Sequence, residues 1–127
     1  MSLSHTSVSV MLPVSDPDRA QKFYSDQLGL SDEGTDERGD HSYGLAGGAH
    51  LVLLTRPDQK PLASTALSFE VSDLEAAIAE LEGSGVVFED YDMPGLKTEN
   101  HIAADDSGRA AWFLDPDGNV LCVHQLS

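Results

Sequence analysis

Hydrophobic and polar residues alternate over short segments of this chain, and these segments lead into helical patterns. Residues 5–12, HTSVSVML, have the period of two that is typical of a half-buried strand. Asp16 and Pro17 then provide a suitable N-cap and first helical position. Gly29 is expected to end this helix. Its inward face would be formed by the apolar residues Ala20, Phe23, Tyr24 and Leu28.

The same order of elements recurs in the second half of the chain. The triplet Val-Ser-Asp begins at residue 14 and again at residue 71, each time between an alternating segment and a helical one. In the second copy, Ser72 and Glu75 match the S-x-x-E capping box. The second helix would bury the stripe Leu74, Ala77, Ile78 and Leu81 and end at Gly83 or Gly85. The shared triplet and the shared order indicate an internal duplication.

The remaining alternating segments predict the other strands. They are expected at 41–46, 50–55, 86–91, 109–114 and 119–126, with a short strand near Leu30. The glycines 47–48 and the sequence DPDGN at 115–119 are typical of hairpin turns. The pattern predicts an α+β fold in one domain, 1–127, built from a β-α-β-β-β module at 1–57 and another at 62–127.

Residues 92–108, DMPGLKTENHIAADDSG, have no clear periodicity, and we expect them to form a long loop. Loops of this length in a compact domain are usually binding loops, lids or disordered segments. Lys97 could carry a single positive charge in such a lid, or it could be a solvated loop lysine. Contact with a ligand and simple covering of a sheet edge are both compatible with this segment.

Charge and composition narrow the function classes. The 127 residues include 22 acids and 7 lysines and arginines, which gives a net charge of −15. Such a field repels phosphate backbones and anionic lipids, so we expect no nucleic-acid or membrane partner. The chain contains one cysteine, no secretory signal pattern and no apolar run approaching the ~18 residues of a membrane span. These features predict a cytoplasmic protein.

The quoted motifs carry a resemblance to a known group of proteins. PVSDPDRAQKFYSDQLGL, the second VSDLEAAIAELEGSGV and the terminal DPDGNVL resemble the glyoxalase/bleomycin-resistance/dioxygenase (vicinal oxygen chelate) superfamily. FEDYDMPGLKTENHIA followed by GRAAWFLDPDGN is similar to a small bacterial branch of it. The resemblance implies two tandem βαβββ modules that form a curved, mostly antiparallel, cup-like sheet with helices outside. It also implies a homodimer.

Enzymes of this superfamily hold a divalent metal on the inner wall of the cup through His, Gln or Glu side chains. The resemblance places the matching positions at Ser9, Val52, Ala66 and Cys122. Three of these are poor ligands, and a lone thiolate cannot hold a metal, because affinity requires several convergent donors. The match therefore predicts no metal and no other cofactor at this place.

A displaced metal site is the alternative. His5, His50, Glu70 and His124 lie at even offsets from the four matched positions, so they could face the same wall. Cys122 could instead pair with His124, although a buried, inert thiol is the simpler interpretation.

The predicted ligand-binding residues follow from the cup. Trp112 lies where the superfamily places a pocket-lining aromatic residue, and the alternative is that it is part of the core. The complete set is Trp112, Cys122, Ser9, His50, Lys97 and His124. The leading hypothesis is a protein that binds a small molecule without a metal. A lyase or dioxygenase with a displaced metal is the alternative enzyme, and a subunit or interaction domain without a ligand is the third possibility.

Overall fold

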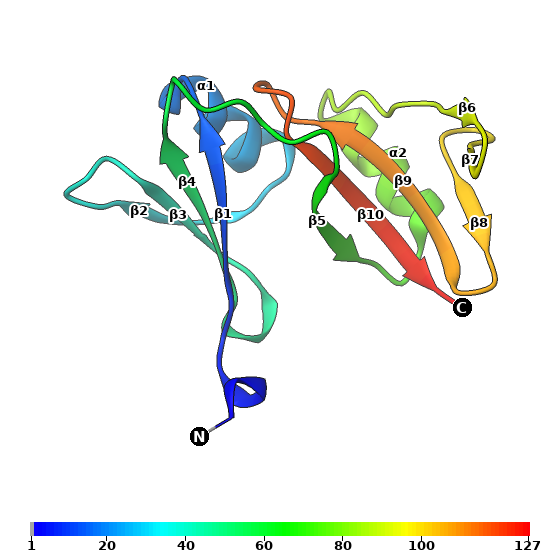
Figure 1. The fold of residues 1–127 in the computed structure, drawn as a ribbon, viewed down its shortest axis with the longest axis horizontal. Coiled ribbons are helices and arrows are strands. Elements are labelled where there is room, and N and C mark those ends of the chain that lie inside the picture. Colours follow the sequence, from blue (N-terminus) through cyan, green and yellow to red (C-terminus); the bar gives the residue numbers. More distant parts are fainter. Residues whose placement is uncertain (1) are drawn as a thin grey trace. The chain divides into compact units, whose positions relative to one another are not determined.

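The computed structural model describes residues 2–127, which form two compact units that divide between Pro61 and Leu62 (Figure 1). Each unit contains one four-stranded sheet and its own helical segment. Each sheet has one parallel and two antiparallel strand pairs, so the α+β class and the two βαβββ modules predicted from the sequence are confirmed. Within the described part of the chain, no helix is long and apolar enough to cross a membrane.

The first unit is built on a sheet with the strand order β1-β4-β3-β2. Its elements are η1 (Leu3–His5), β1 (Ser9–Val14), α1 (Pro17–Lys22), η2 (Phe23–Gln27), β2 (Ser31–Thr35), β3 (His41–Gly44), η3 (Ala46–Gly48) and β4 (His50–Thr55). Side chains of Leu12, Tyr43 and Leu51 on the strands are buried with Tyr24 of η2. The alternation predicted for the strands therefore corresponds to one face that packs inward.

Two boundaries in the first unit differ from the sequence-based prediction. The first strand begins at Ser9 rather than at residue 5, because its parallel pairing with β4 starts at His50. The first helix continues as a turn of π-helix after Lys22, in which the Leu28 amide donates to the Phe23 carbonyl at 3.0 Å. The wider turn contains Phe23 and Tyr24, whose buried rings pack edge to face at 5.1 Å.

The second unit repeats this topology with the strand order β5-β10-β9-β8. Its elements are β5 (Thr65–Glu70), α2 (Leu74–Gly83), β6 (Asp92–Met93), β7 (Leu96–Lys97), β8 (Ala103–Asp105), β9 (Gly108–Leu114) and β10 (Val120–Leu126). Helix α2 contacts β9 and β10 and buries Leu74 and Ile78. The edge strand β5 pairs in parallel with β10, as β1 does with β4. The duplication inferred from the triplet is thus visible in the strand pairing.

The strand predicted at 86–91 is not present, and the predicted loop 92–108 contains three short strands. Phe88 forms only an isolated bridge with Phe113, whereas Ala103–Asp105 pairs with the beginning of β9. The two segments share one edge of β9, so neither forms a long strand there. The residues between them include the small hairpin of β6 and β7.

The cap of the second helix also differs from the prediction. Asp73, not Ser72, is the N-cap, and its carboxylate accepts a hydrogen bond from the Ala76 amide at 3.0 Å. Because the helix begins at Leu74, Ser72 lies one residue too early to cap it.

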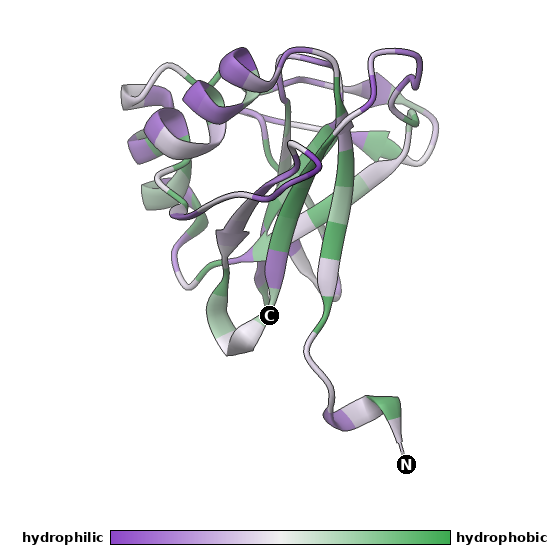
Figure 2. Ribbon diagram, turned by 90° about the vertical axis from the view of Figure 1, so that its left-hand side faces the viewer, coloured by the Kyte–Doolittle hydropathy of each residue, from purple (hydrophilic) through white to green (hydrophobic). Residues whose placement is uncertain are grey.

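The predicted DPDGN turn joins β9 to β10 and is organised by a buried carboxylate. Asp115 Oδ1 accepts from the amides of Asp117 and Asn119 at 2.9 and 2.8 Å, and its Oδ2 accepts from the Asn119 side chain at 2.8 Å. Gly118 has φ 94°, which few other residues tolerate. Figure 2 shows hydrophobic colour along the strands and more hydrophilic colour on helices and loops, as expected for sheets with one covered face.

Candidate functional site

The candidate site lies on one face of the second unit's sheet. Cys122 of β10 is paired with Ser68 of β5 on one side and with Trp112 of β9 on the other. The next paired row on the same face contains Glu70 and His124. Directly paired residues in a sheet point to the same face, so strand register alone brings these side chains together.

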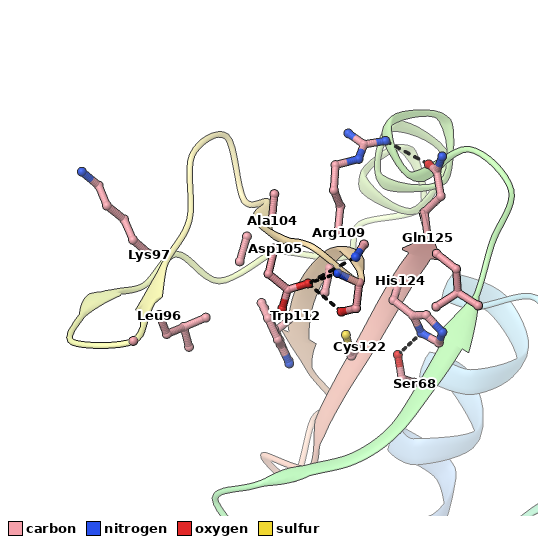
Figure 3. Close-up of a pocket in the computed structure, with 16 residues that line it drawn as sticks. Ser68, Leu96, Lys97, Ala104, Asp105, Arg109, Trp112, Cys122, His124 and Gln125 are labelled. Atoms are coloured by element: carbon pink, nitrogen blue, oxygen red, sulfur yellow. Dashed lines mark hydrogen bonds between the residues drawn. The ribbon is translucent and has the colours of Figure 1, made fainter.

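A pocket of about 400 Å³ opens over this face (Figure 3). All of its lining residues belong to the second unit, and they include Ser68, Leu96, Trp112, Cys122 and His124. Its volume lies within the range of small-molecule sites. The wall combines the apolar and aromatic surfaces of Leu96 and Trp112 with the polar groups of Ser68 and His124. The pocket can therefore contact both a flat apolar body and a hydrogen-bonding group.

Trp112 has its indole nitrogen engaged and its ring on the pocket wall. Nε1 donates to the Thr65 hydroxyl at 3.1 Å, and the ring packs edge to face against Tyr91 at 5.8 Å. Burial raises the pKa of the Tyr91 hydroxyl, with smaller contributions from Glu89 and Cys122. These contacts fix the orientation of the indole, which lines the pocket rather than the core.

Cys122 is only 4% exposed and lies below the open part of the pocket. Burial raises the pKa of the thiol, and hydrogen bonds involving Ser68 and the Ala111 backbone partly oppose that rise. A thiol with a raised pKa is a weak nucleophile at neutral pH because little thiolate forms. The side chain of Cys122 is therefore suited to lining the pocket.

His124 does not pair with Cys122 but with Ser68. The Ser68 hydroxyl lies 2.5 Å from His124 Nδ1, and His124 Nε2 lies 3.9 Å from Glu70 Oε1. The serine is exposed and the imidazole is partly exposed, so both are open to a molecule in the pocket.

Arg109 and Lys97 both line the pocket, but they make different contacts. Arg109 forms a bidentate ion pair with Glu75, with one contact of 2.8 Å, and donates to the Gln125 side chain at 2.9 Å. This pairing connects β9 to α2. Lys97 of β7 lines the pocket rim, and its side chain extends away from Cys122 (Figure 3).

Comparison with known proteins shows the family to which the chain belongs. The family model of the Glyoxalase/Bleomycin resistance protein/Dioxygenase superfamily matches residues 3–123. The chain belongs to this superfamily. No curated protein matches it.

Solved structures of superfamily proteins are similar over nearly the full chain. TnmS3, an antibiotic-binding protein from Streptomyces sp. CB03234, is 30% identical with a TM-score of 0.75, and the match covers 100% of this chain and 99% of that one. A glyoxalase/bleomycin resistance protein from the same organism is 28% identical, covering 94% and 100%, with a TM-score of 0.69. A superfamily member from Sphaerobacter thermophilus DSM 20745 is 25% identical, covering 94% and 95%, with a TM-score of 0.69.

The metal-binding positions implied by the superfamily do not carry a fitting donor set. Val52 and Ala66 offer no side-chain donor, Ser9 offers a neutral hydroxyl, and Cys122 a buried thiol. Among the residues described, no three His, Cys, Asp or Glu side chains gather as a metal site would require. The divalent metal used by enzymes of the superfamily does not fit these residues.

Two of the histidines considered for a displaced metal, His50 and His124, contact other side chains. In the first unit, Ser9 is exposed and pairs through the backbone with His50, whose Nδ1 lies 2.7 Å from Glu33 Oε1. His5 ends the short helix η1. In the second unit, Glu70 and His124 could supply two metal ligands, which is fewer than the three that a metal site requires.

Sequence reasoning missed Ser68. Its position two residues before Glu70 placed it on the strand face of the matched position Ala66. The contact with His124 depends on the register between two strands far apart in the sequence.

Proposed function

We propose that this chain binds an organic small molecule in the pocket of its second unit, without a metal. One observation carries the proposal: the ring of Trp112, the Ser68 hydroxyl and the imidazole of His124 all line one pocket of about 400 Å³. TnmS3, at 30% identity over the whole chain, is an antibiotic-binding protein, which supports a natural product as the class of ligand.

The chemistry of the wall suggests what such a ligand contains. The indole, held by Thr65 and Tyr91, offers a rigid flat surface on which an aromatic ring can pack. Leu96 adds apolar area, and Ser68 and His124 add groups that donate and accept hydrogen bonds. We expect a ligand with a planar aromatic part and at least one polar substituent.

Binding without a metal follows from the donor set. With no side-chain donor at Val52 and Ala66, recognition would rest on packing and hydrogen bonds. Protein purified without chelators is therefore expected to contain no stoichiometric nickel, zinc, manganese or iron. Stoichiometric metal in elemental analysis would contradict this part of the proposal.

The binding test uses the single tryptophan of the chain as its reporter. Titration with a panel of aromatic natural-product antibiotics should quench Trp112 emission saturably for at least one compound. Calorimetry should show that Trp112→Leu weakens binding of that compound by roughly tenfold or more, a typical loss for an aromatic anchor. Met93→Ala is the control, because Met93 is an exposed apolar residue of the same unit outside the pocket. Equal affinity of all three proteins would overturn the proposal.

We further propose that the chain works as a cytoplasmic homodimer. The dimer rests on the resemblance to the superfamily, and the location rests on the lone cysteine, which is typical of a reducing compartment. Light scattering coupled to size exclusion tests the first point, since a mass of one chain at micromolar concentration would contradict it.

A further inference from the structure

Ser68, His124 and Glu70 form a relay beside the pocket: Ser68 and His124 line its wall and are hydrogen-bonded, and Glu70 makes a longer ion-pair contact with His124. The two strands that carry them are adjacent and parallel, and Glu70 is directly paired with His124. The Ser68 hydroxyl lies 2.5 Å from Nδ1 of the imidazole, and Glu70 Oε1 lies 3.9 Å from Nε2 (Figure 3 shows the serine contact). A hydroxyl, an imidazole and a carboxylate thus follow one another in the order used for nucleophilic catalysis.

The tautomer of the imidazole decides the direction of the hydrogen bond between Ser68 and His124. A negative charge beside Nε2 favours the imidazole tautomer that carries its proton on Nε2. Nδ1 is then the acceptor, and the Ser68 hydroxyl donates to it. This is the arrangement in which the imidazole can remove the hydroxyl proton. The neighbouring Cys122 competes little, because burial raises the pKa of its thiol.

We propose that Ser68 is an acyl-accepting nucleophile, with His124 as its base and Glu70 as a positioning residue, acting on activated carboxylic esters bound in the pocket. This activity goes beyond ligand binding. The Ser68 oxygen bonds to the ester carbonyl carbon while its proton moves to His124 Nδ1. The bond from that carbon to the leaving oxygen breaks, and the leaving oxygen takes the proton from His124. Water then hydrolyses the acyl-serine by the same route, which releases the acid.

The class of ester follows from the surroundings of Ser68. Ser68 lies on β5, whose inner side pairs with the central strand β10, so the backbone amides between these two strands are engaged in the sheet and offer little stabilisation to an oxyanion. Esters of phenols and enols are therefore the expected substrates, because their leaving groups need little assistance. A flat phenolic leaving group also fits beside the ring of Trp112.

The test measures acetylation by p-nitrophenyl acetate on the intact chain. We expect a burst of one p-nitrophenol per chain and one acetyl group on the peptide that contains Ser68. Ser68→Ala should abolish both, and His124→Ala should slow the burst by roughly 100-fold, a typical loss for a general base. Added imidazole should partly restore the rate of His124→Ala, which a purely structural role would not permit. Glu70→Gln should slow the burst by roughly twofold to fivefold, because the ion pair is exposed.

Two control variants keep the result unambiguous. Ser64→Ala removes an exposed serine of the same segment that does not line the pocket, and Thr35→Val removes a hydroxyl that contacts a histidine of the first unit at 2.6 Å. Both should retain the full burst. Absence of a burst, or acetylation that persists unchanged in Ser68→Ala, would overturn the inference. The Trp112 titration needs no acyl transfer, so ligand binding by Ser68→Ala would leave the binding proposal intact when acylation fails.

Discussion

The two units contain the same sequence of hydroxyl, imidazole and carboxylate in two different environments. In the first unit, Thr35 Oγ1 lies 2.6 Å from His41 Nδ1, and His41 Nε2 lies 2.9 Å from Asp32 Oδ1. In the second, Ser68, His124 and Glu70 follow the same order with a looser carboxylate contact. The donor and acceptor pattern alone therefore does not distinguish a buried, structural histidine from one that is open to a ligand.

The two relays differ in how exposed their histidine side chains are. The His41 side chain is 7% exposed and packs against Tyr43 at 5.0 Å, whereas that of His124 is 27% exposed and faces a pocket of about 400 Å³. The hollow beside His41, lined in part by Val14, Leu53 and Thr55, has no room for water. We infer that the His41 relay stabilises the first sheet and that the His124 relay is available to a ligand.

The largest expected effect tests whether the two sheets contribute equally to the free energy of unfolding. Leu51 of β4 and Leu121 of β10 occupy corresponding central strands, and both are 0% exposed. Replacing either with alanine should lower the free energy of unfolding by about 3–5 kcal/mol, because each change leaves a cavity. Urea denaturation followed by circular dichroism measures both losses. A loss below about 1 kcal/mol for one of them would show that its sheet does not limit global stability.

The second prediction applies to the relays themselves. His41→Ala should lower the free energy of unfolding by about 2–3 kcal/mol, because it leaves a buried space and ends two polar contacts. His124→Ala should cost less than about 1 kcal/mol, because its partners are open to water. The same denaturation experiment compares the two variants. If His124→Ala costs as much as His41→Ala, the distinction between a structural and an accessible relay is wrong.

A third prediction compares two turns with the same local geometry. Asp36 and Asp115 each accept hydrogen bonds from the amides two and four residues later. Asp115 is 4% exposed and also binds the Asn119 side chain, whereas the Asp36 side chain is 38% exposed. We expect Asp115→Ala to cost about 2–3 kcal/mol and Asp36→Ala about 1 kcal/mol, because an exposed turn can bond to water. Thermal unfolding of both variants gives the ranking, and a larger loss for Asp36→Ala would reverse the argument.

Much of the fold could be predicted because it depends on local patterns. The alternation in β4 and β10, the Pro17 start of α1 and the glycine in DPDGN are properties of a few neighbouring residues. The repeated triplet then gave the order of elements in both modules. The prediction of the strand that pairs with the edge of β9 was wrong. Either Phe88 or Ala103–Asp105 can pair there, and the sequence does not show which segment reaches that edge.

The candidate site was only partly predictable for a similar reason. Trp112 and Cys122 were named from the superfamily pattern, and His124 from its even offset along the strand; all three line the pocket. Ser68 carries no motif, and its contact with His124 arises only after β5 and β10 have paired. Burial of Cys122 is also a tertiary property, because Leu121, Cys122 and Val123 are buried in succession on the central strand of the sheet.

The smallest expected effect concerns the ion pair that joins β9 to α2 in the second unit. The pair consists of Arg109 and Glu75, and the hydrogen bonds from Arg109 lower the pKa of Glu75 to about 2 from the ordinary value of 4.5. A carboxylate whose pKa is depressed in the folded state stabilises it above pH 4.5, and this contribution disappears as the pH falls from 4.5 toward 2. The difference in melting temperature between the wild type and Glu75→Gln should therefore be small but constant near neutral pH. It should shrink across that acidic window. Glu80→Gln, an exposed carboxylate of the same helix, is the control and should show no such trend. A difference that stays constant down to pH 2 would mean that Glu75 acts through helix packing and not through its charge, whereas closure within the window would assign the effect to the pair with Arg109.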